Sequence, residues 1–257
     1  MTSPQESLAE APGRPEGATA AATVAEDLVR RIVAGMPPGS SLASEAELAA
    51  GYGVSRVTVR EAIKMLAGRG LLDLGRGRRA VVREPDGAAL GEFMSWIVQY
   101  DPKGVFDLVE VRLSLEVQSA GLAARRATRP ALAAIEATMA AMHAAAGPLD
   151  AGDAQAETAF HKADVGFHEA VAMAGGNRIL TCLFEAMALP LRQSFFMSRR
   201  GRELRGQTSE HTLAAHAAIL ERVRARDPAG AEEAMRAHLA DSGRDLRAAF
   251  AALPDAG

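Results

Sequence analysis

Four residues in the second half of the chain are of the types that hold a transition metal. Asp164 and His168 stand four positions apart, which places both on one face of a helix. His216 and His238 lie on either side of the turn signal at Asp227, so they can face each other from two antiparallel helices. Three imidazoles and a carboxylate suit a divalent transition metal, with zinc expected and nickel, manganese or iron as alternatives. The spacing alone leaves open that these are four unrelated polar groups.

A stretch nearer the N-terminus carries the groups that a DNA-binding surface needs. Ser55 can cap a helix whose apolar residues recur at helical spacing. Another face of this helix is basic, because Arg56, Arg60 and Lys64 stand four residues apart. Thr58, in the first turn, has a hydroxyl that could reach a phosphate or a base edge. A helix that is anchored on one face and basic on another suits the major groove of DNA.

The segments on either side decide how this basic helix is interpreted, since an isolated one would more simply be a solvated helix with ordinary surface arginines. Upstream, Ser44 and Glu47 form a capping box that starts a short helix, and Gly51 ends it. Downstream, residues 70–74 and 80–82 have the pattern of two short strands around a basic, glycine-rich tip. Together the three elements predict a winged helix-turn-helix.

The composition favours helices and a division into two domains. The chain has 257 residues, 48% of them hydrophobic but only 4% aromatic, which is enough for two helical cores. Residues 24–83 hold ten Lys/Arg and six Asp/Glu, a balance of +4, and residues 1–23 carry −2. The remainder must then carry −5, because the net charge is −3. Positive charge is concentrated in the predicted winged helix, as attraction to phosphate requires.

The chain divides into four segments by composition and turn signals. Residues 1–22 are expected to be a disordered tail, 23–84 the winged helix-turn-helix, 85–87 a hinge and 88–254 an all-helical domain. The one cysteine, Cys182, excludes a disulfide within the chain. No long uncharged apolar run and no signal peptide are found, so we expect a cytoplasmic protein without a membrane partner.

Helix stop signals divide the second domain into helices of ordinary length. The breaks include Gly147–Pro148 and Arg200–Gly201. The expected fold is mostly α: three helices and a small β-wing, followed by an antiparallel bundle. The helices are expected at 24–35 in the first domain and, after one that starts at residue 88, at 105–127, 130–146, 151–174, 177–199, 208–226 and 229–252.

The run PPGSSLASEAELAAGYGVSRVTVREAIKMLAGRGLLDLGRG resembles the DNA-binding domain of the GntR family of bacterial transcriptional regulators. This resemblance implies that Arg56, Thr58, Arg60 and Gly77 meet DNA. Many members have an arginine where this chain has Ala46, so the operator sequence of a relative cannot be transferred. With the neighbouring polar and basic groups, the expected DNA-binding residues are Ser44, Ser55, Arg56, Thr58, Arg60, Lys64, Gly77 and Arg78.

The second domain resembles the FCD ligand-binding domain of the FadR-like branch of the GntR family. The resemblance rests on Asp-x-x-x-His and two later histidines, and it implies a metal on Asp164, His168, His216 and His238. His143, His161 and His211 fall outside the pattern and are expected on the surface.

Two further residues are matched to effector contacts by the same resemblance. Arg112 is expected to hold a carboxylate of the effector, although pairing with Glu116 four residues on is a simple alternative. Asn177 is the second candidate contact, and capping of the following helix is the simpler explanation for it.

These observations together predict a dimeric regulator that binds double-stranded DNA at a palindromic operator and responds to a small carboxylate near the metal. The resemblance to the family favours a repressor, although no residue shows whether the protein represses or activates transcription. One rival is a metal-dependent hydrolase, which is disfavoured because the sequence shows no second carboxylate suitably spaced to act as general base. The other rival is a DNA-binding dimer with no effector.

Overall fold

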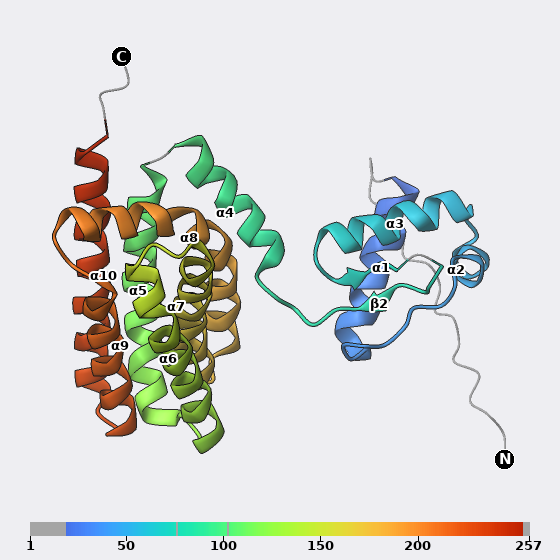
Figure 1. The fold of residues 1–257 in the computed structure, drawn as a ribbon. Coiled ribbons are helices and arrows are strands. Elements are labelled where there is room, and N and C mark those ends of the chain that lie inside the picture. The colour runs from blue at the N-terminus through green and yellow to red at the C-terminus, as the bar shows by residue number, and fades with distance from the viewer. Residues whose placement is uncertain (1–18, 76, 102, 254–257) are drawn as a thin grey trace. The chain divides into compact units, whose positions relative to one another are not determined.

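A computed structural model describes residues 19–75, 77–101 and 103–253 of the chain. It divides into two compact units, Met1–Ala89 and Leu90–Gly257, and each is described by itself (Figure 1). The predicted fold class is confirmed, because the first unit holds three helices with a small sheet and the described residues of the second form helices joined by short turns.

The first unit is built from α1 (Ala20–Gly35), α2 (Glu45–Tyr52), α3 (Arg56–Gly68), β1 (Leu72–Asp73) and β2 (Val81–Val82). Ser44 and Glu47 form the predicted capping box of α2, and Ser55 caps α3 through the backbone N–H of Thr58. The predicted end of α2 at Gly51 is wrong, since Gly51 is helical and α2 runs on to Tyr52. Gly53 instead turns the chain between the two helices with φ +64°, a conformation that glycine adopts without steric cost. These caps fix where α3 begins.

The core of the first unit lies between α1 and α3. Leu28 of α1 packs in one cluster with Val59, Ile63 and Leu66 of α3. Full burial of one such side chain stabilises the fold by about 1.5–3 kcal/mol. The apolar face of α3 is thereby anchored, and its basic face stays exposed.

The wing is a two-stranded antiparallel sheet in which Leu72 pairs with Val82 and Asp73 with Val81. An extended segment, residues 39–42, pairs with β2 on its other side and was not predicted. Val82 donates its N–H to the Ser40 carbonyl at 2.8 Å, and Leu42 donates to Ala80 at 2.8 Å. These bonds connect the wing to the segment that leads into α2.

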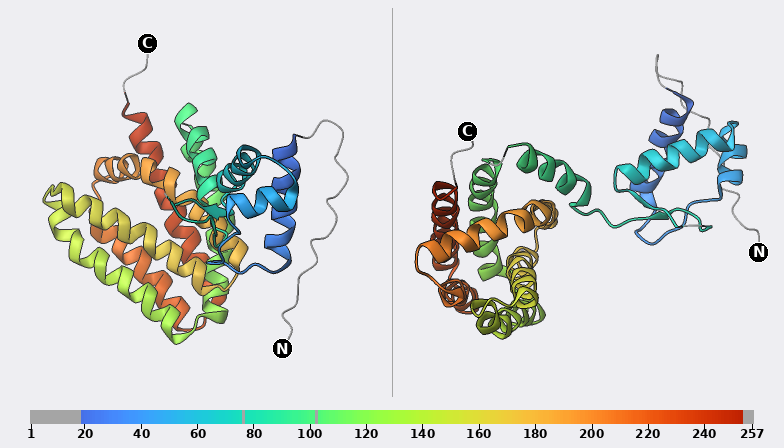
Figure 2. Two further views of the ribbon diagram at one scale, coloured as in Figure 1. Left: turned by 90° about the vertical axis from the view of Figure 1, so that its right-hand side faces the viewer. Right: turned by 45° about the horizontal axis from the view of Figure 1, so that its top comes forward.

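The second unit is a bundle of mostly antiparallel helices, seen from two further directions in Figure 2. The helix α10 packs on α5, α8 and α9, and α7 packs on α5, α6 and α8. A large apolar cluster that includes Phe160, Phe167 and Met235 fills the centre. The elements are α4 (Ala88–Tyr100), α5 (Gly104–Arg126), α6 (Arg129–Asp150), α7 (Ala154–Ala174), α8 (Arg178–Leu204), α9 (Ser209–Arg224) and α10 (Pro228–Ala251).

Two predicted helix breaks are wrong. The first is Gly147–Pro148, since α6 runs on to Asp150. Pro148 and Ala144 are both exposed, so water can reach the carbonyl that the proline leaves without a donor. The second is Arg200–Gly201, since α8 runs on to Leu204. A Cβ at Gly201 would lie 1.7 Å from the Asp245 carbonyl oxygen, so glycine is required there by helix packing.

The expected tail is also too long at its C-terminal end. Thr19 caps α1 with its side chain, and residues 20–22 are helical. Residues 1–18 of that prediction lie outside the described residues. Among the described helices, none combines the length and the apolar character needed to cross a bilayer.

Candidate functional site

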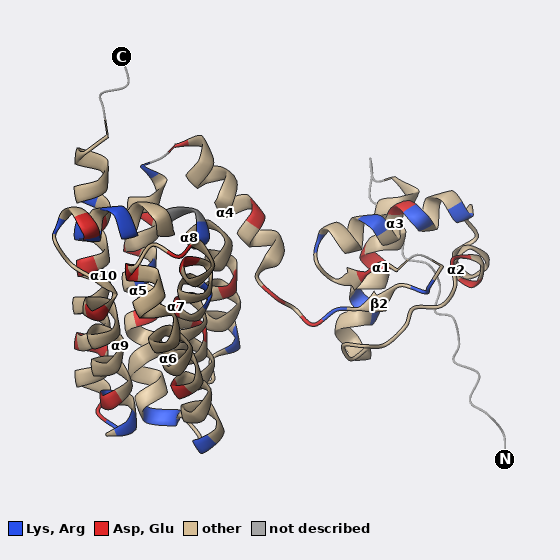
Figure 3. Ribbon diagram, in the orientation of Figure 1, with Lys and Arg blue, Asp and Glu red and all other residues tan. Residues whose placement is uncertain are grey.

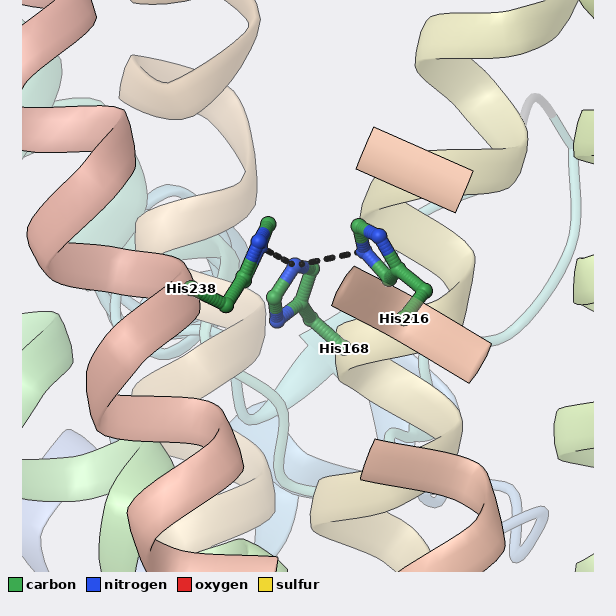
Figure 4. Close-up of side chains that lie close together, drawn as sticks. All are labelled: His168, His216 and His238. Atoms are coloured by element: carbon green, nitrogen blue, oxygen red, sulfur yellow. Dashed lines mark hydrogen bonds between the residues drawn. The ribbon is translucent and has the colours of Figure 1, made fainter. Parts of the chain in front are cut away.

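The four predicted metal ligands come together in the second unit. Asp164 and His168 lie on α7, His216 on α9 and His238 on α10. The Nε2 atom of His168 is 3.2 Å from Nε2 of His216 and 3.3 Å from Nε2 of His238 (Figure 4). The Oδ1 atom of Asp164 lies 3.3 Å from Nε2 of His216. The three histidines form a candidate metal-binding group with Asp164 beside it, and the role of all four as metal ligands stays a prediction.

The separations of these atoms fit a common metal ion. Ligand nitrogens about 2.0–2.1 Å from a metal lie roughly 2.9–3.4 Å apart, for angles between 90° and tetrahedral. The measured nitrogen separations of 3.2 and 3.3 Å fall within this range. Three imidazoles that approach so closely through the same atom type are suited to share one cation.

A hydrogen bond on the far side of the His216 ring and a close carboxylate contact on the far side of the His168 ring favour one tautomer for each. The Nδ1–H of His216 can donate to the carbonyl oxygen of Thr212 at 2.8 Å, and Nδ1 of His168 pairs with Oε2 of Glu116. In a neutral ring this leaves Nε2 with a lone pair, which is the atom a metal binds. Such outer partners also orient a ligating ring and raise its basicity.

The protonation states favour metal binding at neutral pH. Burial, only partly offset by the charge of Asp164, lowers the pKa of His216 to about 4. Burial together with the neighbouring His216 also holds the pKa of His238 well below its usual value. Burial alone would raise the pKa of Asp164, but the surrounding positive charges outweigh it and lower that pKa. Neutral imidazoles beside an ionised carboxylate form the donor set that a divalent cation requires.

The ligands form one wall of a cavity that opens to solvent. It is lined by Asp164, His168 and His238, whereas His216 lies fully buried behind them. Apolar side chains, among them Leu108 and Phe195, line other parts of the wall. An anionic molecule in this cavity could therefore approach the metal site from one side.

Arg112 pairs with Glu116, as one of the two interpretations held, and its contact with an effector stays a prediction. It lines the cavity, and its Nε donates to Oε1 of Glu116 at 2.5 Å. Its Nη2 also lies 3.5 Å from Nε2 of His168. Arg112 and Glu116 thus form a buried pair on α5 that borders the metal site.

Glu116 is a residue whose importance the sequence analysis underestimated. Burial would raise its pKa, but Arg112 and His168 together lower it to about 2. The hydrolase was disfavoured because no second carboxylate was predicted near the metal ligands. That prediction is wrong, since Glu116 contacts His168. Glu116 is nevertheless a weak general base, because its pKa is low and both of its oxygens are engaged.

A second charged cluster lines the cavity, and the sequence analysis did not find it. Arg202 of α8 lies 3.6 Å from Asp245 of α10, and Arg205 pairs with both Asp245 and Asp241. Only the close approach of α8 to α10 at Gly201 brings these charges together. Local spacing could not reveal it, since the partners lie about 40 residues apart in sequence.

His161 and His211 both line the cavity, although His211 is exposed as expected. His161 is half-buried and stacks on Phe195, with ring centroids 4.0 Å apart. His211 is more exposed and bonds through Nε2 to Oδ2 of Asp241 at 2.7 Å. His143 is exposed, as expected.

Asn177 is not among the residues that line this cavity in the described part of the chain. Its Oδ1 accepts the backbone N–H groups of Ile179 and Leu180, so it caps α8. The simpler of the two explanations for Asn177 is therefore the one observed.

The first unit presents a hollow between α2, α3 and the wing. Several predicted DNA contacts line it, namely Ser44, Arg60, Lys64, Gly77 and Arg78. Basic residues recur along the exposed face of α3 (Figure 3). Arg60 makes a two-pronged ion pair with Glu45, with its Nη2 2.6 Å from Oε2 and its Nε 3.0 Å from Oε1.

The other predicted DNA contacts lie at the start of α3. Arg56 is exposed, and the Ser55 and Thr58 hydroxyls are hydrogen-bonded to each other at 2.9 Å. The hydroxyl of Ser55 also caps the helix, so it has a structural role apart from any contact with DNA. The contacts of all these residues with DNA stay predictions.

Comparison with known proteins assigns both units. Residues 20–82 match the model of bacterial regulatory proteins, gntR family, and residues 107–241 match the FCD domain. The chain is 32% identical to the galactonate operon transcriptional repressor of Escherichia coli (strain K12), over 82% of this chain and 89% of that one. It is 28% identical to the Glc operon transcriptional activator of the same strain, over 84% of each chain.

A solved structure agrees with these matches over most of the chain. It is that of Streptococcus agalactiae GntR, with 26% identity and a TM-score of 0.66, covering 87% of this chain and 99% of that one. The resemblances to the GntR family and its FCD domain are thus confirmed. The chain belongs to the FadR-like branch of the gntR family of bacterial regulatory proteins, and it is a ligand-responsive, DNA-binding transcriptional regulator.

Proposed function

We propose that this regulator is a homodimeric repressor whose operator binding is controlled by a small carboxylate bound beside a metal in the FCD domain. The observation that supports it most is the convergence of three histidines, two of which line a cavity that Arg112 also lines. Asp164, His168, His216 and His238 would hold the metal. The bound metal would supply positive charge for a carboxylate oxygen.

The chain's own residues orient the acid and shield the site. Glu116 keeps Nε2 of His168 directed at the metal, and Arg112 can donate to a carboxylate from the cavity wall. Phe195 and its apolar neighbours exclude water from part of the cavity, which strengthens ionic contacts. The metal is proposed as zinc, with nickel, manganese or iron compatible with the same N/O donors.

In the first unit, α3 is proposed to enter the major groove. Phosphates would compete with Glu45 for Arg60, and the wing residues Gly77 and Arg78 would follow the backbone. One recognition helix reads only a few base pairs, so two copies on a palindromic operator are proposed.

A repressor is favoured over an activator by the more similar of the two relatives described above. The repressor is 32% identical to this chain and the activator is 28% identical. Their names connect one of them with galactonate, an acid with a single carboxylate. The acid is proposed to release the operator, which requires that it bind the free and DNA-bound states with different affinity.

The test of the metal site is elemental analysis of the purified protein beside His216→Ala and Asp164→Asn. We expect about one metal per chain in the wild type and a loss of at least about tenfold in metal affinity in both variants, because each loses a ligand. Asp164→Asn keeps the shape of the site, which guards against a folding defect.

His143→Ala, an exposed histidine of α6 outside the ligand set, is the matched control and should keep its metal. Wild-type protein that takes up no divalent metal, or a His216→Ala variant that retains it fully, would refute the proposed site.

A further inference from the structure

Arg202 is the loosely engaged cation of the cavity. Its side chain is 12% exposed and lies 3.6 Å from Asp245. Within the described residues, its guanidinium makes no hydrogen bond, in contrast to that of Arg112. Asp245 is also paired closely with Arg205, so a second cation compensates its charge. A mostly buried guanidinium without hydrogen bonds keeps its N–H donors available for an anion.

The charge balance of the cavity also favours the binding of an anion. The set comprises the charged side chains that line the cavity and their ion-pair partners, with the histidines counted as neutral. Four cations and four anions then cancel, and a divalent metal raises the balance to +2. The cations are Arg112, Arg202, Arg205 and Arg244, and the anions are Glu116, Asp164, Asp241 and Asp245.

A ligand with one carboxylate would leave this cavity with an uncompensated positive charge, whereas one with two would neutralise it. Uncompensated charge is costly in the part of the cavity from which Phe195 and its apolar neighbours exclude water. The two arginines that line the cavity also come from different helices, Arg112 from α5 and Arg202 from α8. They can therefore engage separate groups of one ligand.

We infer that Arg202 binds a second anionic group of the effector, and that the effector is a dicarboxylate. One carboxylate lies at the metal and Arg112, and the other pairs with the Arg202 guanidinium. This inference rests on the proposed function, since it assumes a carboxylate beside the metal. It narrows the ligand class and assigns specificity to a residue of α8.

The experiment titrates the metal-loaded, full-length chain with matched pairs of acids. Within each pair a methyl group replaces the distal carboxylate: L-malate against 2-hydroxybutyrate, and 2-hydroxyglutarate against 2-hydroxyvalerate. Calorimetry gives the Kd of each, and metal content is measured afterwards to exclude chelation. The proteins are wild type, Arg202→Gln, Arg202→Lys and, as a control, Arg200→Gln, an exposed arginine of the same helix that does not line the cavity.

We expect at least one diacid to bind about tenfold or more tightly than its matched monoacid in wild type and Arg200→Gln. The preference should fall to about unity in Arg202→Gln and be partly kept in Arg202→Lys. Equal binding within the pairs, or a preference that survives Arg202→Gln, overturns the inference and leaves the proposed function standing. If neither member of any pair binds the metal-loaded protein, both the proposed function and the inference fail.

Discussion

At the scale of single residues, the site depends on one buried carboxylate that contacts both an arginine and an imidazole. Glu116 bonds to Arg112 and to Nδ1 of His168, so it compensates the arginine and orients the imidazole at once. Removing one partner of such a buried pair costs about 3–5 kcal/mol, because the other charge is left without compensation. Substitutions at Arg112 would therefore disturb the metal site as well as the acid, which makes Arg202 the better probe of ligand binding.

On the proposed DNA-binding surface, Arg60 could exchange its ion pair with Glu45 for a contact with DNA. It is exposed and paired with Glu45 in the absence of DNA. Arg60→Ala should weaken operator binding about tenfold or more, and reduce the dependence of binding on salt if the partner is a phosphate. Glu45→Gln should strengthen binding, since Arg60 is then free from the start. Binding isotherms at several salt concentrations measure both effects.

The matched control is Arg69→Ala, at the exposed C-terminal end of the same helix and outside the hollow. Its operator affinity should stay close to that of the wild type. Equal losses in Arg60→Ala and Arg69→Ala would mean that only net charge matters, and would remove the specific assignment of Arg60.

The proximity of Asp164, His168, His216 and His238 could be predicted from their spacing, whereas their role as metal ligands was implied only by the resemblance to the FCD domain. Asp164 and His168 share a helical face, and His216 and His238 face each other across the turn at Asp227, with ring centroids 4.4 Å apart. The Arg202–Asp245 contact could not be predicted. It depends on how closely α8 approaches α10, which no spacing within either helix encodes.

At the scale of elements, the crossing of α8 and α10 depends on Gly201. A Cβ there would meet the Asp245 carbonyl oxygen at 1.7 Å, so any side chain forces the helices apart. The same closeness brings Arg202, the next residue, beside Asp245. Gly201 therefore permits close helix packing and does not end a helix. A sequence alone does not distinguish these two roles of glycine, because the second depends on the partner helix.

Gly201→Ala should therefore destabilise the metal-free protein by about 1–3 kcal/mol, as overpacking does in a well-packed interior. Gly147→Ala provides the control, because this glycine lies inside α6 with no atom near the added Cβ. It should be neutral or stabilising by up to about 1 kcal/mol, from helix propensity alone. Urea unfolding of both variants measures the difference, and a Gly201→Ala variant as stable as the wild type would contradict the tight crossing.

At the scale of the whole molecule, charge separates the two functions of the regulator. Residues 24–83 carry a balance of +4 within a chain of net charge −3, so the DNA-binding unit attracts phosphate although the whole protein is acidic. This division, like the fold class, could be predicted from composition and motifs. The identity of the acid could not, because the cavity is assembled from α5, α7, α8, α9 and α10.

The central claim is that a carboxylic acid controls operator binding through the metal site. The most direct test measures operator affinity with and without the best-binding acid, for wild type loaded with metal, wild type stripped of metal, and Asp164→Asn. We predict that the acid weakens operator binding of the metal-loaded wild type by about 5- to 150-fold, the usual range of allosteric coupling, and has little effect on the other two. An acid effect of equal size in all three proteins, or none in any of them, would contradict the account.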